Sequence, residues 1–132
     1  MSDLSGKVVL VVDDSASIRR EVKVILQKEG LSVREAGTEF GAFNSMVEYG
    51  VPVDLILMDL SLNDVNGFDL VDKIRTVDRF KEIPIIMLTQ HSDRVNVVKA
   101  KNMGIQGYMI KPINHHILIE KIGQVLGVTS KG

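Results

Sequence analysis

Along the chain, continuous apolar runs alternate with segments whose apolar residues recur at helical spacing. This pattern predicts five strands that alternate with five helices. Uninterrupted apolar, β-branched runs are typical of strands that are buried on both faces. The predicted strands are 8–12, 31–36, 55–58, 83–89 and a short one within GYMIKP, which Pro112 ends. Only 31–36 alternates like a strand with one exposed face, so most of the sheet is expected to lie inside the protein.

Apolar residues recur at helical spacing between these runs. The first predicted helix runs from Ser15 to a stop at Gly30, Thr38 is the expected N-cap of the second, and the fourth runs from about Ser92 to Gly104. The inward faces of the second, third and fifth helices are predicted as Phe40, Phe43, Met46 and Val47, then Phe68, Val71 and Ile74, then Ile117, Leu118, Ile122, Val125 and Leu126. Strands that alternate with helices in this way predict a parallel α/β sheet with helices on both faces.

Length and composition narrow the class of protein. The 132 residues make a single domain, with a core at about 6–127 and short polar tails at both ends. The net charge of −1 and the lack of a basic run give no support for direct nucleic-acid binding. Without cysteine the chain suits a reducing cytosol. No secretory signal starts the chain and no window approaches the ~18 apolar residues of a membrane span, so a cytoplasmic domain without membrane insertion is expected.

Reactive polar residues stand at the ends of the predicted strands. Asp13 and Asp14 follow the first strand, Asp59 follows the third, Thr89 closes the fourth, and Lys111 follows the fifth. Ligands of an open parallel sheet bind at the carboxyl ends of its strands. Two carboxylates ~5 Å apart repel by about 3 kcal/mol at an effective dielectric constant of 20, and one lysine cannot balance three of them. The set therefore predicts a site for Mg²⁺ (or Mn²⁺) beside a carboxylate nucleophile, which is what phosphoryl transfer requires.

Each of these residues has an ordinary explanation when it is taken alone. Asp13 and Asp14 would suit a helix start, and Asp59 would suit a turn. Thr89 has the β-propensity of a plain strand residue, and Lys111 is typical of a surface lysine before a proline. None of these explanations accounts for the complete set in order, so the set favours a functional site.

The set Asp13-Asp14, Asp59, Thr89 and Lys111-Pro112 resembles the receiver domains of two-component response regulators, the CheY-like family. The resemblance covers essentially the whole chain and implies a flavodoxin-like (βα)5 fold with strand order 2-1-3-4-5. It implies that Asp59 accepts a phosphoryl group from a phosphohistidine on a sensor histidine kinase or a histidine phosphotransfer protein. It also implies that the protein is not an enzyme, beyond Mg²⁺-dependent phosphoacceptor and autodephosphorylation chemistry.

The same resemblance implies a role for each residue around the phosphoacceptor. Asp14 and Asp59 would bind the metal directly and Asp13 through water, with the backbone carbonyl of Ser61 as a further ligand. Lys111 would pair with the phosphoryl oxygens.

Two residues resemble the switch of the family. Thr89 would swing to hydrogen-bond a phosphoryl oxygen, and Tyr108 would turn inward when Thr89 moves. Tyr108 has the simpler explanation of a half-buried strand aromatic. Gly67 matches the glycine that ends the loop after the phosphorylated strand.

The chain departs from the family at two positions. Asn63 stands where the family usually has proline, which predicts a softer loop after Asp59. Gln90 stands where receivers usually carry alanine, glycine or serine, and we expect its side chain to crowd the path of the attacking water and lengthen the phosphorylated lifetime. Ser61 and His91 flank the same pocket and are expected to tune the same rate, with a sign that the sequence does not supply.

The expected output is an altered affinity, for a downstream protein target, of the surface built by the fourth helix, the fifth strand and the fifth helix. Lys99, Lys101 and Gln106 are expected to be exposed members of that surface. The receiver is expected to be free-standing because no effector domain follows Gly127, and a phosphorylation-dependent homodimer is compatible with the sequence.

Two other classes of function stay open. One is a phosphorylation-independent, receiver-like scaffold, which would not need the complete set of strand-end residues. The other is an enzyme, either a metal-dependent phosphatase of the haloacid type or an FMN-binding, flavodoxin-like protein. The phosphatase requires a D-x-D pattern where this chain has the adjacent pair Asp13 and Asp14, and the same pair would repel the phosphate of FMN.

Overall fold

A five-stranded parallel sheet forms the centre of the protein, whose computed structural model describes residues 4–47, 52–63 and 65–127. The strands are β1 (Val8–Val12), β2 (Ser32–Ala36), β3 (Leu55–Met58), β6 (Ile85–Thr89) and β7 (Gly107–Ile110). They pair in the order β2-β1-β3-β6-β7, which is the predicted 2-1-3-4-5 when only the strands of this sheet are counted. The predicted flavodoxin-like α/β fold is therefore confirmed. The predicted polar tails lie largely outside the described residues, at 1–3 and 128–132.

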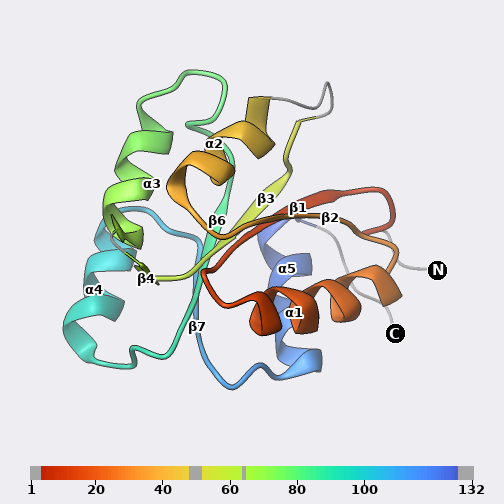
Figure 1. Cartoon of the computed structure of the whole chain (residues 1–132). Helices are drawn as coiled ribbons and strands as arrows, with labels where there is room; N and C mark the ends of the chain where they lie inside the picture. Colours follow the sequence, from red (N-terminus) through yellow and green to blue (C-terminus); the bar gives the residue numbers. More distant parts are fainter. Residues whose placement is uncertain (1–3, 48–51, 64, 128–132) are drawn as a thin grey trace.

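Helices cover both faces of this sheet (Figure 1). In the described part of the chain they are α1 (Ala16–Lys28), α2 (Glu39–Val47), α3 (Gly67–Arg75), α4 (Arg94–Asn102) and α5 (His115–Val125). On one face α1 and α5 pack through residues such as Val22 and Leu118. On the other face α2, α3 and α4 pack through Ala42, Phe68 and Ala100. Among the described residues, no helix has the length and apolar character needed to cross a bilayer.

Strand β1 shows why the central strands are unbroken apolar runs. Val8, Leu10 and Val12 belong to the core under α2, α3 and α4. Val9 and Val11 belong to the core under α1 and α5. All five are buried because helices cover both faces of the sheet. Such a strand has no exposed face, so polar residues follow it only where the chain leaves the sheet.

A small antiparallel hairpin, β4 (Ser61–Leu62) and β5 (Val65–Asn66), lies between β3 and α3. The sequence predicted only a polar loop in this segment. Leu62 is buried, whereas Asn63 is exposed where the chain turns. Asn66 then caps α3, because its Oδ1 accepts the Phe68 N–H at 2.8 Å. The loop that was expected to be soft because of Asn63 contains a paired hairpin and a capped helix start.

Two predicted helix faces are wrong in part. Phe40 and Val47 on α2 are 77% and 50% exposed, and Ile117 on α5 is 54% exposed. The buried residues of α2 are Ala42 and Met46. A helix that packs on one side of a sheet buries only the stripe of its circumference that faces the sheet, so apolar residues outside this stripe stay in solvent on both α2 and α5.

Two predicted element starts also move. The fourth strand of the sheet, β6, begins at Ile85 and not at 83. Pro84 has no N–H to donate to a neighbouring strand, so the ladder starts after it. The helix predicted from about Ser92 begins at Arg94, because Asp93 acts as its N-cap. Both shifts are small and leave the order of elements unchanged.

Candidate functional site

The polar residues at the strand ends come together as the sequence predicted. Asp13, Asp14, Asp59, Thr89 and Lys111 all line one pocket of about 430 Å³ at the carboxyl ends of the strands. The three residues expected to tune the site, Ser61, Gln90 and His91, line the same pocket. The pocket therefore contains every residue for which the sequence predicted a chemical or tuning role, apart from Tyr108.

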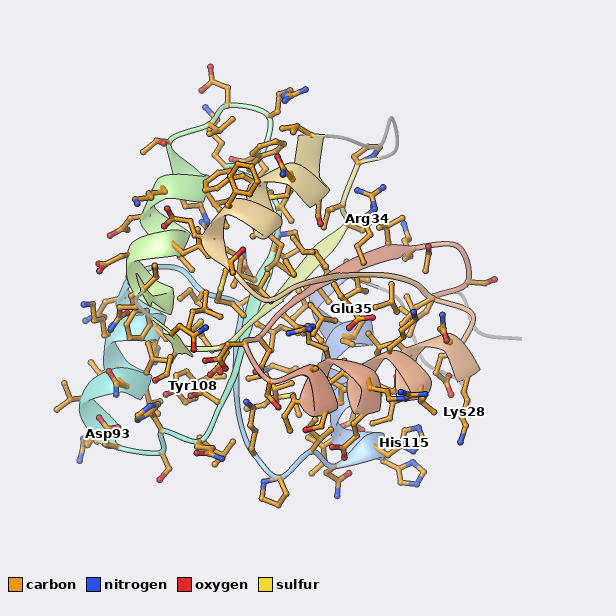
Figure 2. All side chains as sticks on the ribbon, in the orientation of Figure 1. Lys28, Arg34, Glu35, Asp93, Tyr108 and His115 are labelled. Carbon is orange, nitrogen blue, oxygen red and sulfur yellow. The ribbon has the colours of Figure 1, made fainter. Side chains whose placement is uncertain are left out.

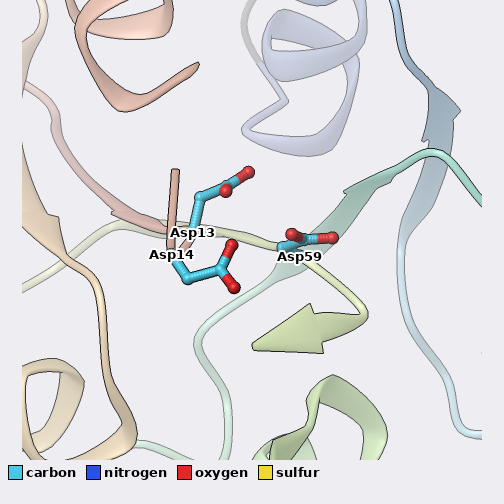
Figure 3. A group of neighbouring side chains, drawn as sticks. All are labelled: Asp13, Asp14 and Asp59. Carbon is cyan, nitrogen blue, oxygen red and sulfur yellow. The ribbon is translucent and has the colours of Figure 1, made fainter. Parts of the chain in front are cut away.

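Three carboxylates form an acidic cluster in this pocket. One oxygen of each of Asp13, Asp14 and Asp59 lies within 4.8 Å of the other two. Figure 3 shows the side chains of Asp13 and Asp14 extending from the end of β1 toward the side on which Asp59 lies. Asp13 and Asp59 are buried, whereas Asp14 is exposed. A ligand from solvent can therefore reach the cluster past Asp14.

Asp13 is the best-held carboxylate of the three. Lys111 Nζ donates to Asp13 Oδ2 at 2.7 Å, and the Ser15 N–H donates to Asp13 Oδ1 at 2.9 Å. The same ammonium lies 3.6 Å from Asp59 Oδ2. Lys111 therefore bridges the two buried carboxylates, with the shorter contact to Asp13 and not to the predicted phosphoacceptor. The Lys111-Pro112 peptide bond is cis.

Asp59 sits in an environment that opposes its negative charge. Burial is the main cause of a raised pKa for this carboxyl, and the charge of Asp13 adds to it. The ammonium of Lys111 and the N–H of Ser61 act in the opposite direction without cancelling the shift. Three clustered carboxylates with one ammonium leave excess negative charge, and clustered carboxylate oxygens are the ligands that hard divalent cations take. The residues present therefore fit a divalent metal.

Thr89 and Tyr108 meet at the main chain of His91. Thr89 is fully buried, and its Oγ1 accepts the His91 N–H at 3.3 Å. The Tyr108 hydroxyl donates to the His91 carbonyl oxygen at 2.6 Å. The His91 side chain bonds in turn to Ser61, with 2.8 Å between Nε2 and Oγ. One loop residue therefore connects the two predicted switch residues with the loop that follows Asp59.

Tyr108 is half-buried at the edge strand β7, on the side of the molecule where Asp93 precedes α4 (Figure 2). Burial raises the pKa of its hydroxyl, and the negative charges of Asp93 and Asp59 raise it further. The hydroxyl is therefore a hydrogen-bond donor at neutral pH, which is the role it has toward the His91 carbonyl.

Gly67 brings the start of α3 close to the segment that carries Asp59. A Cβ at this position would collide with the carbonyl oxygen of Asp59 and would lie 2.9 Å from the Leu60 Cα. The Gly67 N–H also donates to the Leu60 carbonyl at 2.6 Å. Both contacts are to backbone, which cannot move aside easily, so only glycine fits where this loop ends.

Arg19 is a residue of the site that the sequence reasoning missed. Its guanidinium donates to the Asp13 carbonyl oxygen at 2.6 Å and pairs with Glu35 Oε1 at 3.2 Å. Glu35 lies on the edge strand β2, beside α1 (Figure 2). Arg19 thereby ties the end of β1 to α1 and β2. An arginine one turn into a helix gives no sequence signal for such a contact, because the Glu35 partner is distant along the chain.

Three residues were expected on an output surface. Lys99, Lys101 and Gln106 are all exposed. Lys99 places its Nζ 5.0 Å from the centre of the Phe68 ring. The Gln106 side chain accepts the Ile85 N–H at 2.9 Å, at the opposite end of β6 from Thr89. Gln106 is therefore partly engaged in closing the sheet, which the sequence did not predict.

Comparison with known proteins identifies the family of the chain. The sequence model of the response regulator receiver domain matches residues 9–123. The chain belongs to the response regulator receiver domain family. Chemotaxis protein CheY1 of Helicobacter pylori is 38% identical over 120 residues, which cover 90% of this chain and 96% of that protein. The chemotaxis protein CheY homologue of Campylobacter jejuni is 33% identical and covers 92% of this chain and 94% of its own.

Solved structures agree with this assignment to the receiver family. Chemotaxis protein CheY4 of Vibrio cholerae superposes with a TM-score of 0.83 at 30% identity, over 92% of this chain and 99% of that one. A CheY-like receiver domain protein of Methanospirillum hungatei superposes with a TM-score of 0.81 at 33% identity, over 93% and 95% of the two chains. The predicted CheY-like receiver of two-component signalling is thus confirmed, and the receiver family implies a divalent metal site where Asp13, Asp14 and Asp59 cluster.

Proposed function

We propose that this receiver is a phosphorylation-controlled switch that accepts a phosphoryl group on Asp59 with bound Mg²⁺. The donor would be a phosphohistidine on a sensor kinase or a histidine phosphotransfer protein. The observation that carries this proposal is the surroundings of the Asp59 carboxylate. It is buried, has the Lys111 ammonium at 3.6 Å, and shares a cluster with Asp13 and Asp14 in a pocket that reaches solvent.

The transfer is a substitution at phosphorus. An oxygen of the Asp59 carboxylate forms a bond to phosphorus while the bond from phosphorus to the donor ring nitrogen breaks. The electron pair of the broken bond stays on the donor imidazole, which leaves neutral when its other nitrogen carries a proton. After the transfer Lys111 would pair with the new phosphoryl oxygens on Asp59, since its Nζ already contacts the carboxylates of both Asp13 and Asp59. Asp59 must be ionised to act as the nucleophile.

Asp13, Asp14 and Asp59, with the backbone carbonyl of Ser61, are the residues that would hold the metal. Mg²⁺ or Mn²⁺ would supply the positive charge that one lysine cannot, both to the clustered carboxylates and to the transferred group. The exposed carboxylate of Asp14 is placed to meet an ion arriving from solvent, whereas Asp13 is already occupied by Lys111 and Ser15.

Phosphorylation would change the conformation of Thr89 and Tyr108 and, through them, the surface of α4, β7 and α5. Phosphorylation adds about −1.5 to −2 charge next to Thr89. Thr89 Oγ1 and the Tyr108 hydroxyl both bond to His91, so a movement of one changes the surroundings of the other. Only Ala100 of α4 is buried, so this helix can shift at low cost and change its affinity for a protein target.

Intact mass measurement with a small acyl phosphate donor tests the proposal. With Mg²⁺, wild type should gain the mass of one phosphoryl group, and Asp59→Asn should gain none. Asp72→Asn, which removes an exposed carboxylate on α3, is the matched control and should behave like wild type. A wild-type protein that gains no mass, or an Asp59→Asn variant that still does, would instead support a phosphorylation-independent scaffold.

Gln90 belongs to the same proposal as a residue that slows dephosphorylation. Its exposed side chain lines the pocket next to Thr89, where it would crowd the water that attacks the phosphoryl group. Gln90→Ala should lose the phosphoryl group about threefold to tenfold faster than wild type, as expected for an obstacle worth about 1 kcal/mol in the barrier. The decay of the phosphorylated mass after removal of the donor measures it. An equal or slower decay in the alanine variant would rule this role out.

A further inference from the structure

Arg19 has contacts that give it a role at the metal site beyond tying α1 to the sheet. Its guanidinium donates to the carbonyl oxygen of Asp13, which belongs to the peptide group that joins Asp13 to Asp14. We propose that Arg19 is a positioning residue, which orients this peptide group and thereby directs the Asp14 carboxylate toward the acidic cluster. The consequence for metal affinity rests on the metal site proposed above, whereas the consequence for the conformation of Asp14 does not.

Asp14 is the carboxylate of the cluster that has no side-chain partner to orient it. It is exposed and, among the described residues, its side chain makes no hydrogen bond or ion pair. Asp13, by contrast, uses both carboxylate oxygens, toward Lys111 and Ser15. One Asp14 oxygen nevertheless lies within 4.8 Å of oxygens of Asp13 and Asp59 (Figure 3). Because the rotamers open to a side chain depend on its backbone, the backbone of Asp14 decides whether its carboxylate meets the other two.

Hydrogen bonds hold both of the peptide groups that flank Asp14. On one side, Arg19 Nη1 donates to the Asp13 carbonyl oxygen at 2.6 Å. On the other side, the Ser15 N–H donates to Asp13 Oδ1 at 2.9 Å. A peptide group is planar, so a bond to its oxygen or its N–H restrains the whole group. The two groups together set the φ and ψ of Asp14, and Arg19 supplies one of the two restraints.

Arg19 is itself held in a fixed direction by the neighbouring strand. Its Nε lies 3.2 Å from Glu35 Oε1 on β2, and Lys23 Nζ lies 3.6 Å from Glu35 Oε2. A guanidinium is planar and its donors point in fixed directions, so a contact at Nε also fixes where Nη1 points. Lysine would keep the charge without the second donor. The substitution Arg19→Lys therefore separates the geometry of the guanidinium from its charge.

Gly37, the residue after β2, leaves the space that the guanidinium occupies. A Cβ at this position would lie 2.9 Å from Arg19 Nη1 and 3.7 Å from the Asp13 carbonyl oxygen. The first distance is too short for a carbon and a nitrogen that are not bonded, so the flexible end of Arg19 would have to move. Gly37 does not have a positive φ, so its backbone accepts alanine. Gly37→Ala thus displaces the guanidinium while every charge of the site remains.

The first measurement concerns the metal-free protein. By NMR, Arg19→Gln and Gly37→Ala should each shift the carbonyl carbon signal of Asp13, because its hydrogen bond is lost or weakened. The order parameter of the Asp14 N–H should fall in both variants, since one restraint on its backbone is gone. Arg20→Gln, at the exposed arginine next along α1, is the control and should leave both signals unchanged. Unchanged signals in Arg19→Gln would overturn the proposal.

The second measurement is the Kd for Mn²⁺, obtained from the EPR signal of the free ion. Arg19→Lys and Gly37→Ala keep every charge and should each raise the Kd about tenfold, the lower end of the usual loss when a residue that supports a metal ligand is replaced. Arg19→Gln should also raise it, although the removal of a positive charge would by itself favour a cation. Gly37→Ala should add little in the Arg19→Gln background, because both act on the same contact.

The opposite pattern would identify Arg19 as a charge only. Wild-type affinity in Arg19→Lys, or tighter binding in Arg19→Gln, would overturn the proposal. The control Arg20→Gln removes an equal charge and should bind Mn²⁺ within about twofold of wild type, the size of a weak surface charge effect. If Arg19→Gln does not fold, Gly37→Ala decides both measurements. If wild type binds no Mn²⁺, the proposed metal site fails, and the signals of Asp13 and Asp14 alone decide the role of Arg19.

Discussion

At the scale of single residues, Asp59 combines two properties that oppose each other. The proposed phosphoryl transfer requires it to be ionised, yet its burial and the neighbouring charge of Asp13 raise its pKa. Lys111 relieves only part of this conflict, since its shorter contact is to Asp13. A charged carboxylate in such a place lowers the stability of the folded protein, and we interpret that loss as a consequence of the proposed role of Asp59 as nucleophile.

Replacing Asp59 by asparagine should therefore stabilise the metal-free protein at neutral pH. Because the folded pKa is raised above the usual 3.8, ionisation costs folding stability as the pH rises from about 3.8 through the folded pKa. Asp59→Asn lacks this loss, so its advantage should be small at pH 3.5 and reach a plateau near pH 7. We expect about 1 to 2 kcal/mol there, because the variant avoids the burial of a charge and the repulsion by Asp13, less the lost attraction of Lys111.

Thermal unfolding in the presence of a chelator measures this difference across the pH range. For a chain of this size, 1 kcal/mol corresponds to a shift of roughly 3–6 °C in Tm. Asp72→Asn, on the exposed side of α3, is the control and should show no comparable gain. An Asp59→Asn variant that melts at or below the wild-type temperature at pH 7 would contradict the interpretation.

At the scale of elements, the sequence predicted what depends on local pattern. The buried strands were readable because Val8 to Val12 is apolar throughout, and Thr38 was readable as an N-cap, since its Oγ1 accepts the Gly41 N–H at 3.0 Å. Phe40 was misplaced because helical spacing shows which residues share a face, not whether the sheet is wide enough to cover them all.

The elements that were missed depend on contacts distant along the chain. The hairpin β4–β5 has two residues in each strand, which is too short for a period to be seen. At the site, the strand-end set was predictable because parallel strands deliver their last residues to one edge. The bond between Ser61 and His91 and the contact of Arg19 with the Asp13 carbonyl were not, since each depends on the mutual position of two loops or of a loop and a helix.

A valine on α1 should contribute much more to the free energy of unfolding than a valine on α4. Val22 on α1 is fully buried, whereas Val98 on α4 is 44% exposed. Val22→Ala should lower the free energy of unfolding by about 2 kcal/mol or more, through lost burial and a cavity. Val98→Ala should change it by less than about 0.5 kcal/mol, since alanine also favours the helix. Urea unfolding of both variants measures this contrast. A large loss in Val98→Ala would show that α4 is anchored more firmly than its burial suggests.

At the scale of the whole molecule, the buried core carries one helix, α4, that contributes a single buried residue to it. The apolar strands and α1 hold the strand ends in place, and the acidic pocket lies on the edge where they end. Helix α4, with one buried residue, lies beside that edge and is joined to it through the loop of His91. If the proposed function holds, stability resides in the core, whereas signalling uses the loops and α4.

Metal binding should couple the pocket to the stability of the entire fold. An ion that binds only the folded protein stabilises it by about 1.4 kcal/mol at ten times its Kd. Mg²⁺ should therefore raise the Tm of wild type by roughly 4–8 °C at that concentration. Asp59→Asn and Asp13→Asn should gain much less, because each removes one carboxylate of the cluster. The control Asp72→Asn should gain as much as wild type.

The stabilisation of wild type by Mg²⁺ should oppose the stabilisation that Asp59→Asn brings to the metal-free protein. Without metal the asparagine variant is expected to melt above wild type, because a repelled charge is gone. As Mg²⁺ is added, wild type should gain stability and the variant should not, so the difference between the two should narrow and then reverse. A metal titration followed by melting temperature in both proteins tests this crossing. Curves that rise in parallel would mean that the ion binds elsewhere, and that the cluster of Asp13, Asp14 and Asp59 is not the metal site.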